Sequence, residues 1–172
     1  PSALVDRGTA IDPSAMEIDF LQRITQAPTA FITNSAKWYP ISRKLEVTVT
    51  ADFQTAANSN YKLGCVITED GVKGTTSGYN QSNAYAGGGN GPMGGYENKP
   101  NPVPASQMVY DHVARGIQPD FNGMENSFPA TVNNGETYSQ TFTFDVAENW
   151  NINKMHIIGL LYNPQGKIDN AG

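Results

Sequence analysis

The segment Lys44–Phe53 alternates between polar and apolar side chains over its whole length. Its apolar positions are Leu45, Val47, Val49, Ala51 and Phe53, and its polar positions include Glu46, Thr48, Thr50 and Asp52. Successive side chains of an extended strand point to opposite faces, so this alternation places every apolar group on one face. The segment therefore predicts a half-buried strand of an antiparallel sheet.

Other short apolar runs, bounded by turn-forming residues, predict further strands. They cover residues 30–33, 61–68, 137–146, 155–162 and 167–170. The run 155–162 is almost entirely apolar, which favours a central strand buried on both faces. Residues 108–117 fit a helix and a strand equally well, and both interpretations stay open. Several short strands separated by turns predict an all-β fold, an antiparallel β-sandwich of jelly-roll or Greek-key type.

A single helix is predicted near the N-terminus, over residues 13–26. Asp12 or Ser14 can cap this helix, Ser14 and Glu17 have the spacing of a capping box, and Pro13 suits the first helical turn. The apolar residues that share one helical face are Met16, Phe20, Leu21 and Ile24. We therefore divide the chain into a strand-helix segment, residues 1–27, and a β-sandwich domain, residues 28–172.

Composition narrows the class of protein. The net charge is -5 with only 11 Lys and Arg residues, and these are scattered, which argues against nucleic-acid binding. The charged share is 16%, so the surface depends on neutral polar groups, as in extracellular or cell-surface β proteins. No apolar stretch approaches the length of a transmembrane helix. Cys65 is the sole cysteine and lies in an apolar run, which indicates a buried side chain and no internal disulfide.

A long loop, residues 71–107, interrupts the strand pattern and is rich in glycine and proline. Unstructured loops longer than about 15 residues are uncommon in compact domains and are usually functional or disordered. The candidate binding residues within it are Tyr79, Tyr85, Met93 and Tyr96. These side chains could form a platform for a protein partner or a sugar, because aromatic groups bury large areas at low entropic cost. Alternatively, they anchor the loop to its own sheet.

Metal and catalytic sites receive less support. No cofactor is predicted, but the carboxylates of Asp52, Glu69 and Asp70 are candidate calcium ligands, the alternative being a solvated turn. His112 and His156 are the two histidines of the chain, and we interpret both as structural. A hydrolase centred on His112 lacks a nucleophile elbow. Asp111 and Arg115 are spaced to form an ion pair.

Three segments together resemble a known family. They are PSALVDR at residues 1–7, VITEDG at residues 66–71 and YDHVAR at residues 110–115. In this order they are similar to the 28-kilodalton outer-membrane-protein-related family of Bacteroidota, which contains lipoprotein-like surface proteins. The resemblance implies that residues 1–27 are the tail of a thioredoxin-like domain. It also implies that His112 and Arg115 belong to a binding element.

The resemblance and the composition lead to one functional expectation. We expect a non-catalytic protein of the outer-membrane or extracellular surface that acts through protein-protein contacts, as an adhesin, a receptor or an accessory subunit of a surface assembly. The alternative is a carbohydrate-binding module that uses the loop tyrosines. In both cases the loop, residues 71–107, is the expected interaction site, because variable loops on a rigid scaffold carry binding residues.

Overall fold

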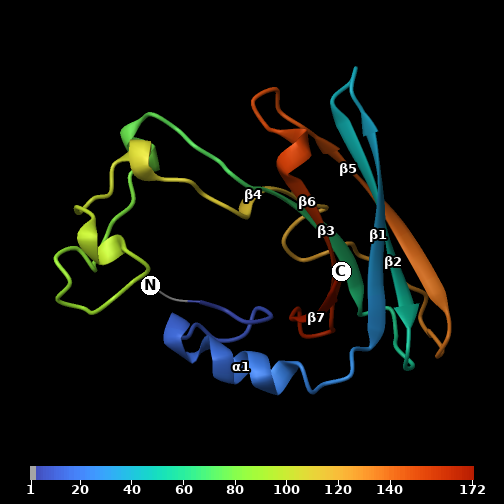
Figure 1. The fold of residues 1–172 in the computed structure, drawn as a ribbon. Helices are drawn as coiled ribbons and strands as arrows, with labels where there is room; N and C mark the ends of the chain where they lie inside the picture. Colours follow the sequence, from blue (N-terminus) through green and yellow to red (C-terminus); the bar gives the residue numbers. More distant parts are fainter. Residues whose placement is uncertain (1–2) are drawn as a thin grey trace.

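The computed structural model describes residues 3–172, and they form two antiparallel sheets packed face to face (Figure 1). The three-stranded sheet has the order β1-β2-β5, and the four-stranded sheet has the order β4-β3-β6-β7. The strands are β1 (Ala30–Tyr39), β2 (Lys44–Phe53), β3 (Lys62–Glu69), β4 (Val113–Gln118), β5 (Thr137–Asp145), β6 (Met155–Tyr162) and β7 (Ile168–Ala171). The predicted all-β sandwich is confirmed.

Strand β2 has the bounds and the orientation that its alternation predicts. Its five apolar side chains are buried against the second sheet, and they are Leu45, Val47, Val49, Ala51 and Phe53. On the opposite face, the hydroxyl groups of Thr48 and Thr141 lie 3.0 Å apart. Those of Thr50 and Ser139 lie 2.8 Å apart. The central strand of the three-stranded sheet thus directs its apolar side chains into the core, and its polar side chains form hydrogen bonds with those of β5 on the outer face.

The core lies between the sheets, where Gly159 on β6 allows a close approach. A Cβ atom on Gly159 would lie 2.8 Å from Val49 Cγ1 and 3.0 Å from Ile32 Cγ2. Cys65 on β3 is fully buried, as predicted, and this burial raises the pKa of its thiol to about 12. A thiol in such a site stays protonated and behaves as a small hydrophobic side chain.

Several boundaries differ from the sequence prediction. The ambiguous run, residues 108–117, ends as strand β4, which pairs with β3. Strand β1 continues well beyond residue 33 to Tyr39, because the ladder with β2 holds its polar second half in register. The helix begins as a 3-10 turn, Pro13–Ala15, and continues as α1 (Met16–Arg23). Strand β6 is an inner strand, although several of its side chains are only partly buried rather than buried on both faces.

Of the two predicted caps, Asp12 and Ser14, it is Asp12 that caps the N-terminal helical segment, and the Ser14–Glu17 capping box does not form among residues 3–172. The Asp12 Oδ1 atom accepts from the backbone N–H of Ser14 at 2.9 Å. Helix α1 lies beside the edge strand β7 (Figure 1), and Arg23 at its C-terminal end pairs with Asp6 and donates to the Ile168 carbonyl at 2.9 Å. The described part of the N-terminal segment is therefore fastened to the sandwich by polar contacts.

The long loop projects from the sandwich as an arm, on the left of Figure 1. It contains three 3-10 turns, Ser77–Tyr79, Tyr96–Asn98 and Ala105–Gln107. Gln81 and Val103 form an isolated β-bridge between its outgoing and returning halves. Among residues 3–172, no helix has both the length and the apolar character needed to span a membrane.

Candidate functional site

The base of the arm is closed by paired contacts between its two ends. Val72 and Tyr110 exchange two backbone hydrogen bonds, each of 2.9 Å. Next to them, the Asp111 carboxylate accepts from the backbone N–H of Gly71 at 2.8 Å. Gly71 has a φ of +71°, a conformation that glycine adopts without steric strain. We call the segments 70–72 and 110–112 the neck, and it holds the two ends of the arm together.

Asp70 lies at the foot of the neck and contacts both histidines. Its Oδ1 atom accepts from the backbone N–H of His112 at 2.7 Å and lies 3.0 Å from His112 Nδ1. Its Oδ2 atom lies 2.8 Å from Nε2 of His156 on β6. The pKa of Asp70 is lowered, chiefly by the backbone hydrogen bond from His112 and further by the hydrogen bond from His156. The carboxylate is therefore ionised at neutral pH.

Arg115 has a different partner from the one expected. Its Nε atom lies 2.7 Å from Oε2 of Glu69, whose other oxygen accepts from the backbone N–H of Asn151 at 2.8 Å. Glu69 is only 5% exposed, and the Arg115 guanidinium lies 5.3 Å from the centre of the Trp150 ring. Because Asp111 caps Gly71 instead, the predicted Asp111–Arg115 pair does not form within residues 3–172. Arg115 is thus held within the sandwich, by Glu69 of β3 and by the ring of Trp150.

The three calcium candidates are not brought together. Asp52 lies on β2 in the three-stranded sheet, where its Oδ1 atom accepts from the Thr137 hydroxyl at 3.3 Å. Glu69 has both oxygens engaged, and Asp70 belongs to the histidine cluster. The sequence could not separate these carboxylates, because Glu69 and Asp70 are neighbours in sequence but point to different partners.

Asn83 organises the tip of the arm and is only 5% exposed. Its Nδ2 atom donates to the Tyr96 carbonyl at 2.7 Å, and its Oδ1 atom accepts from the backbone N–H of Tyr85 at 3.1 Å. Its own backbone N–H donates to Oδ1 of Asn101 at 3.0 Å. One buried amide therefore joins the two halves of the tip.

Glu97 fixes the glycine-rich turn beside it. Its Oε2 atom accepts from the backbone N–H groups of Met93 at 2.8 Å and of Gly95 at 3.0 Å. The pKa of Glu97 is lowered, chiefly by the hydrogen bond from Met93. The Glu97 carbonyl also accepts from the backbone N–H of Gly87 at 3.0 Å. These contacts give order to a segment whose composition alone suggests a flexible chain.

The loop tyrosines divide into two groups. Tyr79 anchors the loop, because its ring lies over Gly74 and its carbonyl accepts from the Tyr110 hydroxyl at 2.9 Å. Tyr85, Met93 and Tyr96 instead line a shallow cavity of about 510 Å³ at the tip. The other lining residues are Gln81, Ser82, Asn83, Ala84 and Asn101. Tyr79 thus has the anchoring position, whereas Tyr85, Met93 and Tyr96 lie together at this cavity, and His112 and Arg115 lie apart from it.

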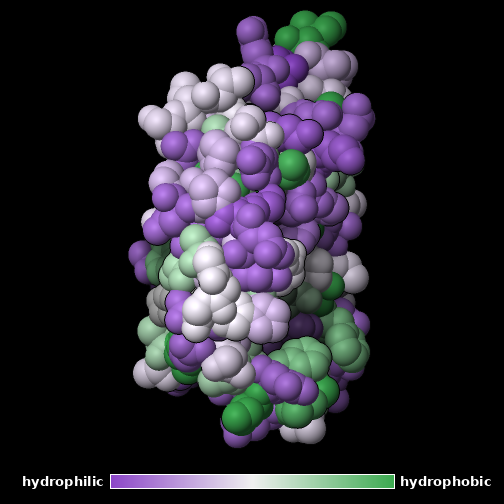
Figure 2. All heavy atoms as spheres, turned by 60° about the vertical axis from the view of Figure 1, so that its left-hand side comes forward, coloured by the Kyte–Doolittle hydropathy of each residue, from purple (hydrophilic) through white to green (hydrophobic). Residues whose placement is uncertain are grey.

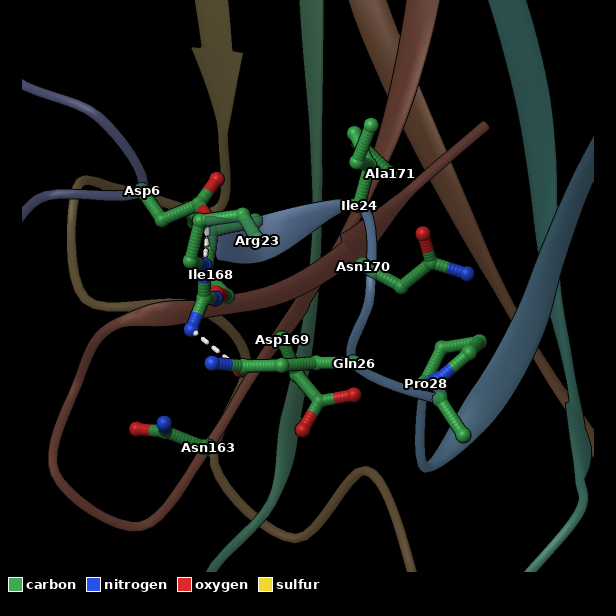
Figure 3. A pocket seen from close by; sticks show the side chains of 11 residues that line it. Asp6, Arg23, Ile24, Gln26, Pro28, Asn163, Ile168, Asp169, Asn170 and Ala171 are labelled. Carbon is green, nitrogen blue, oxygen red and sulfur yellow. Dashed lines mark hydrogen bonds and ion pairs between the residues drawn. The ribbon is translucent and has the colours of Figure 1, made fainter. Parts of the chain in front are cut away.

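Two features escaped the sequence prediction. Helix α1, its C-cap residue and the irregular segment before it leave large apolar side chains more than half exposed, namely Leu4, Ile18, Phe20, Leu21 and Ile24. The lower end of the molecule in Figure 2 gathers hydrophobic side chains, where Figure 1 places α1. Between α1 and β7 lies a cavity of about 480 Å³, into which Arg23, Gln26 and Asp169 project (Figure 3). The amphipathic pattern predicted an apolar helix face, but a sequence pattern does not say what covers such a face.

The fold and the arm define a class: a two-sheet β-sandwich that presents a folded loop on one side. The chain also matches the family described as outer membrane protein Omp28 over residues 1–171. It therefore belongs to this family, and the resemblance found in the sequence is confirmed at this level. Localisation at the outer-membrane surface follows from the family description. No curated protein and no solved structure gives a match.

Proposed function

We propose that this chain is a non-catalytic protein of the outer-membrane surface that binds another protein through the tip of its arm. The observation that carries the proposal is the cavity lined by Tyr85, Met93 and Tyr96, held in place by the buried Asn83. Aromatic and methionine side chains are enriched where protein interfaces concentrate their binding energy. The arm that carries them projects away from the sandwich (Figure 1), and none of the three belongs to the hydrophobic core cluster between the sheets.

The order of the tip supports binding. A flexible loop loses conformational entropy when it binds, and this loss weakens the affinity. Here the hydrogen bonds of Asn83 and Glu97 fix the backbone before any partner arrives. A glycan is the alternative ligand, since tyrosine rings can stack on sugars. The Asn83 amide is already used within the loop, and this leaves fewer polar groups to orient a sugar, so a protein partner is favoured.

Site-specific photo-crosslinking tests the proposal. A benzoylphenylalanine at Met93 should crosslink to a discrete protein in intact outer membranes, whereas the same group at Ile41 should not. Ile41 is a matched control because it is fully exposed, at 101%, on the turn between β1 and β2. Equal crosslinking from the two positions would contradict a binding role for the tip. Binding to a glycan array that disappears on replacing Tyr85 and Tyr96 with alanine would favour the carbohydrate alternative.

We propose that the protein is an adhesin, a receptor or an accessory subunit of a surface assembly in a bacterium of the Bacteroidota, with lipoprotein-like anchoring.

We also propose that the N-terminal segment, residues 1–27, is the end of a thioredoxin-like domain, which would cover the exposed apolar face of α1. That face supports the idea, because Phe20 and Leu21 are more than half exposed in this structure. The intact mass of the natural gene product tests it, since a thioredoxin-like domain requires a substantially longer chain.

A further inference from the structure

The side chains of Asp70, His112 and His156 converge from three separate parts of the chain. Asp70 directly follows β3, His112 directly precedes β4, and His156 lies on β6. A carboxylate oxygen and one nitrogen from each imidazole all lie within 4.8 Å of one another. This is the one group of three such donors found among residues 3–172. The long loop, residues 71–107, lies between the first two of these residues.

Two imidazole nitrogens and one carboxylate oxygen form a donor set that zinc prefers. Zinc binds these atoms at about 2.0–2.2 Å in a tetrahedral arrangement, which places neighbouring ligand atoms about 3.3 Å apart. In the structure, the Asp70 oxygens lie 3.0 Å from His112 Nδ1 and 2.8 Å from His156 Nε2. Small rotations of the exposed imidazoles would therefore admit an ion between the three groups.

The backbone at His112 takes part in the same cluster. Its φ is +55°, in the left-handed region, where residues other than glycine are uncommon. This conformation directs both its backbone N–H and its ring Nδ1 to the same Asp70 oxygen. The peptide N–H and the ring of His112 are therefore both held next to the Asp70 carboxylate.

The surroundings leave the site accessible. The side chains of His112 and His156 are 76% and 53% exposed, so an ion can enter from solvent and water can supply the fourth ligand. Glu69, the carboxylate next to Asp70 in sequence, is occupied by Arg115 and does not compete for the ion. Asp111, next to His112, is turned to the Gly71 N–H.

We infer that Asp70, His112 and His156 bind a zinc ion, which fastens the neck of the arm to β6. Asp70 and His112 belong to the opposite sides of the neck, so an ion shared by them links the outgoing and returning chains of the loop. His156 adds an anchor in the four-stranded sheet, because β6 pairs directly with β3. Zinc binding would stabilise the closed neck, and with it the orientation of the arm. This inference does not depend on the nature of the ligand at the tip.

The inference is tested by titrating the untagged, chelator-treated chain with Zn²⁺, followed by calorimetry and native mass spectrometry. We expect one ion per chain. The variants Asp70→Asn, His112→Asn and His156→Gln should each weaken binding by more than about 100-fold, since even loss of an outer hydrogen-bond partner typically reduces metal affinity 10- to 100-fold. Asparagine is chosen at position 112 because it tolerates a positive φ.

Asp111→Asn is the matched control for the Asp70 variant. It removes one negative charge from the neck but keeps an acceptor for the Gly71 N–H, so its zinc affinity should stay within a few-fold of wild type. Absence of stoichiometric binding to the wild-type chain would overturn the inference. Binding that survives in the His112→Asn/His156→Gln double variant, or equal loss in Asp111→Asn, would overturn it as well.

Hydrogen exchange provides the readout for the fastening role. Saturating zinc should slow exchange at the backbone amides of Val72 and Tyr110, which hold the neck closed, and should leave the central amides of β2 unchanged. Binding with no change at the two neck amides would contradict the role of the ion as a fastener.

Discussion

Replacing Asn83 with alanine should release the tip of the arm without unfolding the sandwich. The side chain makes two well-formed hydrogen bonds, to the Tyr96 carbonyl at 2.7 Å and from the Tyr85 N–H at 3.1 Å. Each such bond contributes about 0.5–1.5 kcal/mol net, and a buried group left without a partner costs about 1–3 kcal/mol. Since Asn83 is only 5% exposed, the expected loss is about 2–4 kcal/mol of local stability.

Hydrogen exchange followed by mass spectrometry measures this loss. Local opening that becomes easier by about 2–4 kcal/mol accelerates exchange about 30- to 1,000-fold, because about 1.4 kcal/mol corresponds to a factor of ten. The informative amides are those of Gly87 and Met93, which hydrogen-bond to Glu97 and not to Asn83 itself. The melting temperature should change little, because the tip lies outside the core between the sheets.

Asn90→Ala is the matched control in the same loop. The Asn90 side chain is exposed and makes one hydrogen bond, to the Ala84 carbonyl at 2.6 Å. We expect it to change local stability by no more than about 0.5 kcal/mol, as for most surface positions. The reasoning is refuted if Asn83→Ala leaves Gly87 and Met93 protected, or if the two variants accelerate exchange equally.

Three other variants or conditions probe the ion pair between β3 and β4, the tip and the core. Glu69→Ala leaves the Arg115 guanidinium without its buried partner and should destabilise the fold by about 3–5 kcal/mol in denaturant titrations, whereas Glu69→Gln should destabilise it less. Acidification should loosen the tip: the lowered pKa of Glu97 gives stability that is present above its ordinary value of 4.5 and is lost as the pH falls through the lowered value. Amide exchange at Met93 reports that change. Gly159→Ala places a methyl group 2.8 Å from Val49 Cγ1 and should cost about 1–3 kcal/mol, with a corresponding fall in melting temperature.

The strands could be predicted where periodicity reports burial directly. Lys44–Phe53 has one face of polar side chains toward solvent and one face of buried apolar side chains, so its bounds and orientation follow from the alternation alone. Residues 108–117 gave no such answer, because much of that run closes the neck and strand β4 begins only at Val113. There, pairing with β3 determines the structure, and a local pattern does not report a distant partner.

The sequence could name the aromatic residues of the long loop but not the contacts that bring three of them to one cavity. Aromatic residues in a glycine-rich loop indicated the tip. The buried Asn83 gave no periodic signal, because its partners are backbone groups brought close by the fold. His156 meets Asp70 because the β3–β6 ladder pairs Thr68 with His156, and His112 meets it because the β3–β4 ladder pairs Glu69 with Val113. These registers are properties of the folded sheet and could not be read from the spacing of the histidines.

Hydroxyl-radical footprinting tests the central claim most directly, because the chain carries two matched probes. Met93 at the tip of the arm and Met16 on α1 are both 44% exposed in the isolated chain, so they should oxidise at similar rates when the protein is purified. In intact outer membranes, binding through the tip predicts that Met93 becomes protected relative to its rate in the purified chain. Oxidation of Met93 at the same rate in both preparations would contradict the account, whatever happens to Met16.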